Sequence, residues 1–267
     1  MPTEKRQRQK EGRASRQAAL EAYRRKAARR RQLVFGVGAL AIAVVIVALL
    51  SRGGDKSQKV KAGSSTTARG SNTTVATGKV GSSPCPPADG SAPRKITFDG
   101  EPPTCIDPAR TYAAKVDTDI GSFTVALESQ KAPRTVNNFV FLARYHFFDG
   151  VNFHRVIPGF VVQGGDAANG DGTGGPGYKF ADELPKSVDE YKAGSMAMAN
   201  SGPNTNGSQF FVVVSDAGGK QLQQPKYSLF GQVTQGLDVV TKIEADGSPE
   251  GQPKVLHKMV KVTITQA

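Results

Sequence analysis

The sequence contains no tryptophan, only two cysteines and only three histidines among 267 residues. Without tryptophan, any apolar pocket must be built from phenylalanine, tyrosine and aliphatic side chains. The histidines His146, His154 and His257 form no H-E-x-x-H or H-x-x-x-H pattern, and two cysteines do not complete a zinc site. The G-x-S-x-G elbow and the G-K-[ST] ending of a phosphate-binding loop are also missing. We therefore expect no metal, no cofactor and no covalent catalysis.

Acidic side chains are scarce at the N-terminus, and this shortage explains most of the net charge of +12. Residues 1–31 hold twelve lysines and arginines but only three glutamates, so the rest of the chain carries a net charge of only +3. Such a basic arm either binds nucleic acid or flanks a membrane span on its cytoplasmic side. The residues that follow favour the membrane interpretation, and we expect no nucleic-acid partner.

Residues 33–50 contain no charged side chain. At about 1.5 Å per residue, a helix of this length spans roughly 27 Å, close to the hydrocarbon thickness of a bilayer. A buried core helix usually has a polar stripe, which is lacking here. A cleaved signal peptide is the competing interpretation, but the apolar run is long and no small-x-small cleavage pattern follows it. We predict an uncleaved transmembrane helix over residues 32–51, in a single-pass cell-membrane protein with a cytoplasmic N-terminus and an extracytoplasmic C-terminal part.

The next two segments have the composition of a linker and of an ordered loop. Residues 52–84 are rich in serine, threonine, glycine and lysine, which predicts a flexible linker. Residues 85–111 are rich in proline and contain Cys85 and Cys105. An oxidising compartment beyond the membrane would let these cysteines pair, and their spacing is too long for C-x-x-C redox chemistry. We predict a structural disulfide, with two free thiols as the alternative.

Residues 112–267 have the pattern of a mainly β domain. Alternating apolar and polar residues predict a β-hairpin over residues 113–128. Helical spacing, with a proline in the first turn, predicts a helix over residues 133–143, and a second helical pattern begins at Leu237. Further strands are predicted over residues 153–156, 160–163, 196–199, 209–214, 229–233 and 255–265. Many short strands, two helices and glycine-rich connections predict a closed antiparallel β-barrel.

Two segments carry a specific signature. Residues 153–166 read F-H-R-V-I-P-G-F-V-V-Q-G-G-D, and residues 195–211 read S-M-A-M-A-N-S-G-P-N-T-N-G-S-Q-F-F. They resemble the two signature stretches of the cyclophilins, a family of peptidyl-prolyl cis/trans isomerases. The similarity continues in A-P-R-T-V-N-N-F from residue 132, G-T-G-G from residue 172 and L-F-G-Q-V from residue 229. It implies an eight-stranded closed barrel with a helix at each end, here in a membrane-anchored bacterial form.

The resemblance also implies a role for individual residues in a groove on the outside of the barrel. Arg155 corresponds to the catalytic arginine. The proline pocket would be lined by Phe160, Val161, Phe211 and Leu222. Tyr227, also expected to bind substrate, stands where the family often has histidine. The substrate backbone would be held by Gln163, Asn200 and Gln209. The neighbouring pocket would be shaped by Gly172, Ala199 and Ser201.

Taken singly, these side chains have ordinary structural interpretations. Arg155 would more often be a surface salt-bridge partner, and Phe160 and Phe211 would be core residues. His154 precedes Arg155 in a predicted strand, so we expect it to be structural and to point to the opposite face.

The chain departs from the family pattern at three positions. Gln221 or a neighbour stands where the family has tryptophan, Tyr227 replaces a histidine, and Val161 replaces a common methionine. The missing tryptophan puts tight binding of cyclosporin-type inhibitors in doubt, but the catalytic arginine is retained.

We therefore expect a monomeric isomerase that binds proline-containing polypeptides and assists the folding of extracytoplasmic proteins. The alternative is a binding module with little turnover, because binding and catalysis use the same residues.

Overall fold

The computed structural model describes residues 78–267. The basic arm, the predicted transmembrane helix and nearly all of the predicted linker lie outside the described residues. Between residues 78 and 267, no helix combines the length and the apolar character needed to cross a membrane. The elements are β1 (Tyr112–Thr118), β2 (Gly121–Leu127), α2 (Pro133–Arg144), β3 (Arg155–Ile157), β4 (Val161–Gly164), η1 (Val188–Glu190), β5 (Ser195–Met198), β6 (Phe210–Val213), α3 (Asp216–Gln221), β7 (Leu229–Gln235), α4 (Leu237–Ala245) and β8 (Met259–Gln266).

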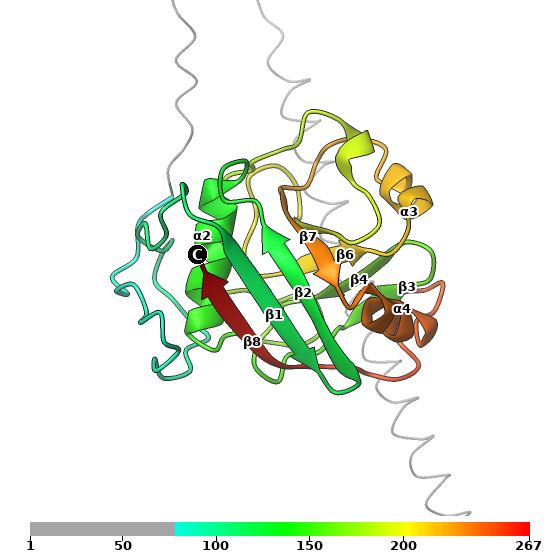
Figure 1. The fold of residues 1–267 in the computed structure, drawn as a ribbon, viewed down its shortest axis with the longest axis horizontal. Coiled ribbons are helices and arrows are strands. Elements are labelled where there is room, and N and C mark those ends of the chain that lie inside the picture. Colours follow the sequence, from blue (N-terminus) through cyan, green and yellow to red (C-terminus); the bar gives the residue numbers. More distant parts are fainter. Residues whose placement is uncertain (1–77) are drawn as a thin grey trace, which may run out of the picture. The chain divides into compact units, whose positions relative to one another are not determined.

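The eight strands form one antiparallel sheet in the order β3-β4-β6-β5-β7-β2-β1-β8. Figure 1 shows β8, β1 and β2 side by side, with α2 close to β8. The predicted hairpin is formed by β1 and β2, which turn directly into each other between Thr118 and Gly121. The mainly β fold with helices packed on the sheet is therefore the one expected from the sequence.

The prediction that the barrel is closed is wrong. Within the described residues, β3 and β8, the two ends of the sheet, form no ladder with each other. The outer edge of β3 is occupied instead, because the Val156 N–H donates to Gly251 O at 2.9 Å and Val156 O accepts from Ser248 N–H at 3.1 Å. The chain that precedes β3 and the chain that precedes β8 are joined by a short bridge at Asn152 and Lys258. The sheet is curled but open.

The main core lies between the inner face of the sheet and α2. Phe139 of α2 stacks on Phe148 with ring centroids 5.0 Å apart, and Phe210 and Phe230 of the sheet pack around it at 5.6 and 5.4 Å. All four rings are almost completely buried. Aromatic pairs in these offset and edge-on geometries stabilise a core beyond their area alone.

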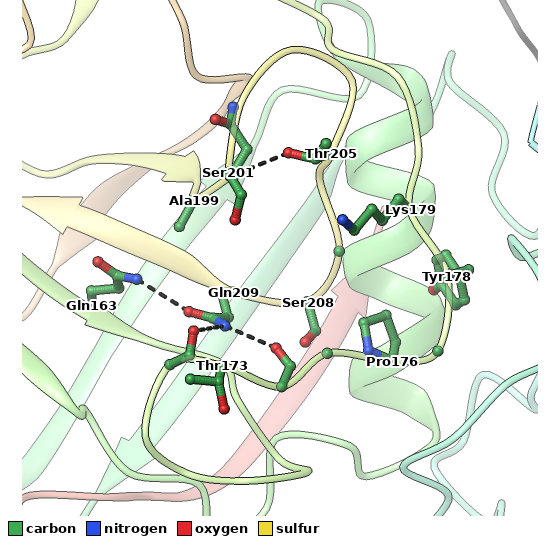
Figure 2. A pocket seen from close by; sticks show the side chains of 16 residues that line it. Gln163, Thr173, Pro176, Tyr178, Lys179, Ala199, Ser201, Thr205, Ser208 and Gln209 are labelled. Atoms are coloured by element: carbon green, nitrogen blue, oxygen red, sulfur yellow. Dashed lines mark hydrogen bonds between the residues drawn. The ribbon is translucent and has the colours of Figure 1, made fainter. Parts of the chain in front are cut away.

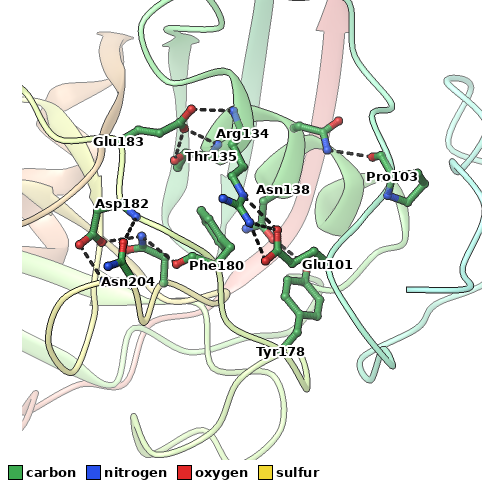
Figure 3. A network of polar contacts seen from close by, with 12 residues as sticks. Glu101, Pro103, Arg134, Thr135, Asn138, Tyr178, Phe180, Asp182, Glu183 and Asn204 are labelled. Atoms are coloured by element: carbon green, nitrogen blue, oxygen red, sulfur yellow. Dashed lines mark hydrogen bonds and ion pairs between the residues drawn. The ribbon is translucent and has the colours of Figure 1, made fainter. Parts of the chain in front are cut away.

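A distant carboxylate, rather than a local side chain, caps the start of α2. The N-cap position offers no side-chain cap. Glu183 accepts instead from the N–H groups of Arg134 and Thr135 at 3.0 and 2.7 Å (Figure 3). A negative charge at this end also complements the helix dipole. The sheet-side loop that carries Glu183 is thereby tied to α2.

Helix α3 was not predicted, because its sequence contains two adjacent glycines. Those glycines are needed for close packing: a Cβ on Gly218 would lie 2.6 Å from Gly159 O, and one on Gly219 would lie 1.8 Å from Tyr191 O. Ser215 starts the helix by accepting from the Gly218 N–H at 2.9 Å. Tertiary contact therefore overrides the low helix propensity of glycine here.

Residues 78–111, here called the strap, run over α2 without regular secondary structure. Cys85 and Cys105 are joined by a disulfide within it. Phe98 packs on Phe141 and Tyr145 of the helix region, with ring centroids 5.0 and 5.5 Å away. The strap is therefore part of the same folded unit as the sheet.

A partly buried ion pair also holds the strap to α2. Arg134 donates from Nε to Glu101 Oε2 at 2.9 Å and from Nη2 to Glu101 Oε1 at 2.7 Å (Figure 3). The Phe98 N–H donates to Pro176 O at 2.8 Å. The strap thus supports both the helix and the loop around residue 176, which forms part of the candidate site.

Candidate active site

The strand register places the central residues of the candidate site in one row. Arg155 of β3 lies opposite Gln163 of β4. Gln163 lies opposite Phe211 of β6, which in turn lies opposite Ala197 of β5. Because opposite residues on neighbouring strands share a face, the pairing puts a guanidinium, an amide and an aromatic ring side by side.

This row lies on the face of the sheet that points away from the main core. The residues that alternate with it, such as Val162 and Phe210, are buried in the main core. The outer face carries a second, smaller apolar cluster, centred on Phe211. The cluster includes the four residues predicted to line the proline pocket, either as buried members (Val161, Phe211) or packed against it (Phe160, Leu222), and Tyr227 also packs against it. The structure therefore brings these five together.

Tyr191, which was not predicted from the sequence, holds Tyr227 of the apolar cluster in place. Its hydroxyl donates to Tyr227 O at 2.6 Å and accepts from the Tyr227 N–H at 3.1 Å. Burial raises the pKa of Tyr191 to about 12, which keeps the hydroxyl protonated. The Tyr227 ring then meets Phe211 edge-on, with centroids 5.3 Å apart. A lone tyrosine before a glycine turn gives no sequence signal for this role.

Arg155 lies between the apolar cluster and a row of amides. Its Nη1 donates to Gln163 Oε1 at 3.1 Å. Its guanidinium carbon is 5.8 Å from the centre of the Phe160 ring. Within residues 78–267 the guanidinium makes no other hydrogen bond and no ion pair, so its remaining N–H groups are available to a ligand. Arg155 is thus not the surface salt-bridge partner that an isolated arginine would be.

The amide row continues through a relay of hydrogen bonds (Figure 2). Gln163 Nε2 donates to Gln209 Oε1 at 3.1 Å. Gln209 Nε2 donates to Gly172 O at 2.9 Å and to Gly174 O at 2.8 Å. Since carbonyl oxygens only accept, the orientation of Gln209 is determined, and with it the orientation of Gln163.

One carboxylate shapes the glycine-rich loop that supplies those carbonyls. Asp166 is 2% exposed. It accepts backbone N–H groups at 2.9 to 3.1 Å from Ala168, Asn169, Gly172 and Gly174. Although burial opposes the effect, these N–H groups hold the pKa of Asp166 below its usual value.

Two pockets flank the relay. A pocket of about 730 Å³ is lined by six of the residues predicted to bind substrate: Gln163, Gly172, Ala199, Asn200, Ser201 and Gln209. Figure 2 shows Ala199 and Ser201 across this pocket from Gln163 and Gln209. Asn200 donates to Lys226 O at 2.9 Å, which links the pocket rim to the chain entering Tyr227.

The other wall of this pocket was not predicted from the sequence. It is formed by residues 173–179, together with Thr205, Gly207 and Ser208. Pro176 in this wall is the residue whose carbonyl is held by the strap. The sequence contains one signal for this wall, the run G-T-G-G from residue 172. The rest of the wall depends on the contact between Phe98 and Pro176, which are nearly eighty residues apart in the sequence.

A second pocket of about 620 Å³ lies on the other side of Arg155. Its walls come from Arg155, Gln163, the loop at residues 170–172 and the loop at residues 250–256. His154 also lines it, so the expectation that His154 points to the opposite face is wrong. The strand begins only at Arg155, and strand alternation does not apply to the residue before it. Burial lowers the pKa of His154, which favours the neutral ring.

Comparison with known proteins identifies this arrangement. The family model described as cyclophilin type peptidyl-prolyl cis-trans isomerase/CLD matches residues 113–266. The chain belongs to this family. Its activity is accordingly the cis/trans isomerisation of X–Pro peptide bonds. In residues 78–267, no group of three or more His, Cys, Asp or Glu side chains is placed to hold a metal ion.

Similar cyclophilins come from fungi, bacteria and protozoa. The chain is 40% identical over 152 residues to peptidyl-prolyl cis-trans isomerase-like 1 of Aspergillus fumigatus, covering 54% of this chain and 92% of the relative. It is 38% identical over 176 residues to peptidyl-prolyl cis-trans isomerase A of Mycobacterium tuberculosis, covering 58% and 94%.

Among solved structures, a Cryptosporidium parvum cyclophilin-type isomerase is similar with a TM-score of 0.53 and 29% identity, covering 58% of this chain and 98% of the other. A second structure of that protein, in the presence of the dipeptide Ala-Pro, has a TM-score of 0.52 and 29% identity, covering 57% and 98%. The family match covers the part of the chain that holds the sheet and leaves out residues 1–112.

Proposed function

We propose that this cyclophilin accelerates X–Pro bond rotation in extracytoplasmic proteins, with Arg155 as its catalytic residue, in a membrane-anchored bacterial form. The observation that supports the role of Arg155 is its position. The guanidinium stands between an apolar cluster and a hydrogen-bonding amide row, with donors left over. A proline ring fits against the cluster, while the flanking peptide lies along Gln163 and Gln209.

The reaction requires no group that this site lacks. The barrier to peptide rotation is about 18–20 kcal/mol, because the nitrogen lone pair is delocalised into the carbonyl. In the twisted state that delocalisation is lost and the lone pair becomes a hydrogen-bond acceptor. A guanidinium N–H aimed at the prolyl nitrogen stabilises this state more than either planar state, which is the condition for catalysis.

The apolar cluster has a complementary part in this mechanism. Phe211 and Tyr227 form a rigid edge-on pair, and Tyr191 holds that pair from behind. A ring seated against this wall stays in place while the residue before it rotates. The Ala-Pro dipeptide with the Cryptosporidium relative supports proline-containing peptides as the ligands of this chain.

Two variants of Arg155 test the catalytic role in the full-length protein. Arg155→Ala removes the donors, and we expect kcat/KM for an Ala-Pro peptide to fall by about a hundredfold or more. Arg155→Lys keeps the charge but loses the planar fork of donors, so it should restore only part of the rate. Exchange spectroscopy by NMR measures the rates directly. Parental activity in Arg155→Ala would refute the proposed mechanism.

The location is proposed from the first part of the chain. The basic residues 1–31 and the uncharged residues 33–50 fit a cytoplasmic arm followed by a span. Single cysteines introduced at residue 10 and at residue 235 of a variant lacking Cys85 and Cys105 test the orientation in intact cells. A membrane-impermeant maleimide should label only the second. Labelling of the first alone would reverse the topology, and labelling of neither would place both on the inside.

A further inference from the structure

His257 makes an unusual pair of contacts for a buried histidine. The residue is 5% exposed. Its Nδ1 is 2.9 Å from Asp119 Oδ2, and its Nε2 is 2.9 Å from Asp246 Oδ2. Carboxylates only accept hydrogen bonds, and a neutral imidazole has a single N–H donor. Both contacts are therefore satisfied only when the ring carries both protons and is an imidazolium.

The three residues belong to three separate parts of the fold. Asp119 is in the turn between β1 and β2, Asp246 ends α4, and His257 precedes β8. We call His257 with Asp119 and Asp246 the clamp. Two further hydrogen bonds support it: Asp119 Oδ1 accepts from the Lys258 N–H at 2.9 Å, and Asp246 O accepts from the Lys254 N–H at 2.6 Å. The loop at residues 247–256 therefore starts and ends at this one ring.

The loop closed by this clamp lies against the catalytic arginine. The Val156 N–H donates to Gly251 O at 2.9 Å, so the loop is paired with the strand that carries Arg155. A Cβ on Gly251 would lie 3.2 Å from Arg155 Cγ and 3.6 Å from its Nε, so the side chain of Arg155 runs along the Gly251 α-carbon. The Phe153 N–H also donates to His257 O, at 2.9 Å. The clamp and Arg155 are thus joined through two backbone contacts.

We propose that His257, as an imidazolium held between Asp119 and Asp246, is a positioning residue that keeps the loop at residues 247–256 against Arg155. Loss of its proton leaves one aspartate without a donor and loosens the loop. Arg155 then loses the loop that lies against its side chain. The rate falls even though the apolar cluster that would hold the proline ring is intact. The inference rests on the proposed catalytic role of Arg155.

The charges around the ring fix the direction of the pH dependence. Within the described residues, the ring faces Asp119 from the β1–β2 turn and Asp246 from the end of α4, while Lys254 and Lys258 approach only with backbone N–H groups. Burial works against the charged form, but the bonds to Asp246 and Asp119 raise the pKa of His257. The clamp is therefore complete below the ordinary imidazole pKa of about 6.5 and is lost as the pH rises through the higher folded value.

The experiment uses the full-length protein and an Ala-Pro peptide without titrating side chains. Long-range nitrogen–proton NMR follows the His257 ring, and exchange NMR follows kcat and KM, between about pH 6 and about pH 9. We expect both ring nitrogens to be protonated near neutral pH. We also expect kcat to fall by about tenfold along the His257 titration. The change in KM should be smaller, because Arg155 is displaced and the apolar cluster is not.

Two glutamine variants serve as test and matched control. His257→Gln should give a low kcat that no longer falls over this range, since a single amide nitrogen replaces only one of the two ring nitrogens that donate to Asp119 and Asp246. His146→Gln removes a histidine that also contacts an aspartate but lies at the strap, and its profile should match that of the parent. A ring with one proton near neutral pH, or a kcat that is constant while His257 titrates, would overturn the proposal without any variant having to fold.

Arg155→Ala, measured in parallel, separates this inference from the proposed function. If Arg155→Ala is inactive and the parental profile is flat, the positioning role of His257 is wrong and the catalytic role of Arg155 stands. If Arg155→Ala is as active as the parent, the proposed mechanism fails, and the positioning inference fails with it.

Discussion

Arg155 and Gln163 face each other across β3 and β4, and the guanidinium donates to the Gln163 side-chain oxygen at 3.1 Å. The Gln163 amide is oriented in turn by Gln209, whose own amide is held by two backbone carbonyls. The position of the Arg155 guanidinium therefore depends on a chain of hydrogen bonds that begins in the glycine-rich loop. A defect at either glutamine is transmitted to the arginine.

Replacing Gln163 with leucine should test this dependence. The substitution keeps the volume but removes the acceptor for Arg155, so we expect kcat to fall by about tenfold. KM should also rise, since Gln163 lines the pocket of about 730 Å³. Gln235→Leu is the matched control, because Gln235 is exposed at the end of β7, and its activity should be that of the parent. An unchanged kcat in Gln163→Leu would show that Arg155 is positioned without the relay.

Tyr227 should matter for its ring rather than for its hydroxyl. The ring packs edge-on against Phe211, and Tyr191 binds only the Tyr227 backbone. We expect Tyr227→Phe to keep kcat/KM within about twofold, whereas Tyr227→Ala should raise KM by about tenfold, equivalent to about 1.4 kcal/mol of lost contact. Steady-state measurements on both variants decide the point. Equal losses in the two would assign the role to the hydroxyl, which then replaces the histidine common in the family.

The sequence indicated the parts of the fold that depend on local pattern. The β1–β2 hairpin and helix α2 follow from alternation and helical spacing, and the long signature singled out residues of the apolar cluster on the outer face. The features that were missed depend on contacts between distant segments. Gly218 and Gly219 form a helix only because Gly159 and Tyr191 lie against them.

The open sheet and the second wall of the larger pocket also depend on contacts between segments that are distant in the sequence. A loop takes the edge of β3 that a closed barrel would give to β8, and no propensity distinguishes those two partners. The wall at Pro176 depends on the strap, and the contacts of His257 include one with Asp119, far away in the sequence. His154 was placed wrongly because the strand starts at Arg155, two residues later than predicted.

Asp166→Asn should weaken the glycine-rich loop in a pH-dependent way. An amide replaces a carboxylate that accepts several backbone N–H groups, so we expect a loss of about 1–3 kcal/mol in the free energy of unfolding at neutral pH. Because the folded pKa of Asp166 is lowered, its contribution is complete above the ordinary value of about 3.9 and is lost as the pH falls through the folded value. The stability difference between parent and variant should therefore shrink in acid.

Chemical denaturation at several pH values measures this difference. Asp171→Asn is the control, since Asp171 is in the same loop but exposed to solvent, and it should change stability far less. The loop also supplies the carbonyls that orient Gln209, so kcat of Asp166→Asn should fall at neutral pH. A stability difference that persists unchanged in strong acid would mean that Asp166 acts by shape and not by charge.

Removal of the disulfide should lower stability with little effect on activity at moderate temperature. The bridge closes a loop of 20 residues between Cys85 and Cys105, for which chain entropy gives about 3 kcal/mol. For a domain of this size, that corresponds to a fall of roughly 6–12 °C in Tm. The strap retains its contacts through Phe98 and the Glu101–Arg134 pair, so the wall at Pro176 stays supported. Thermal unfolding and isomerase rates of the double Cys85→Ser, Cys105→Ser variant check both parts. A parental Tm would contradict the expected loss of stability. A loss of activity below the unfolding transition would contradict the expectation that the site is unaffected.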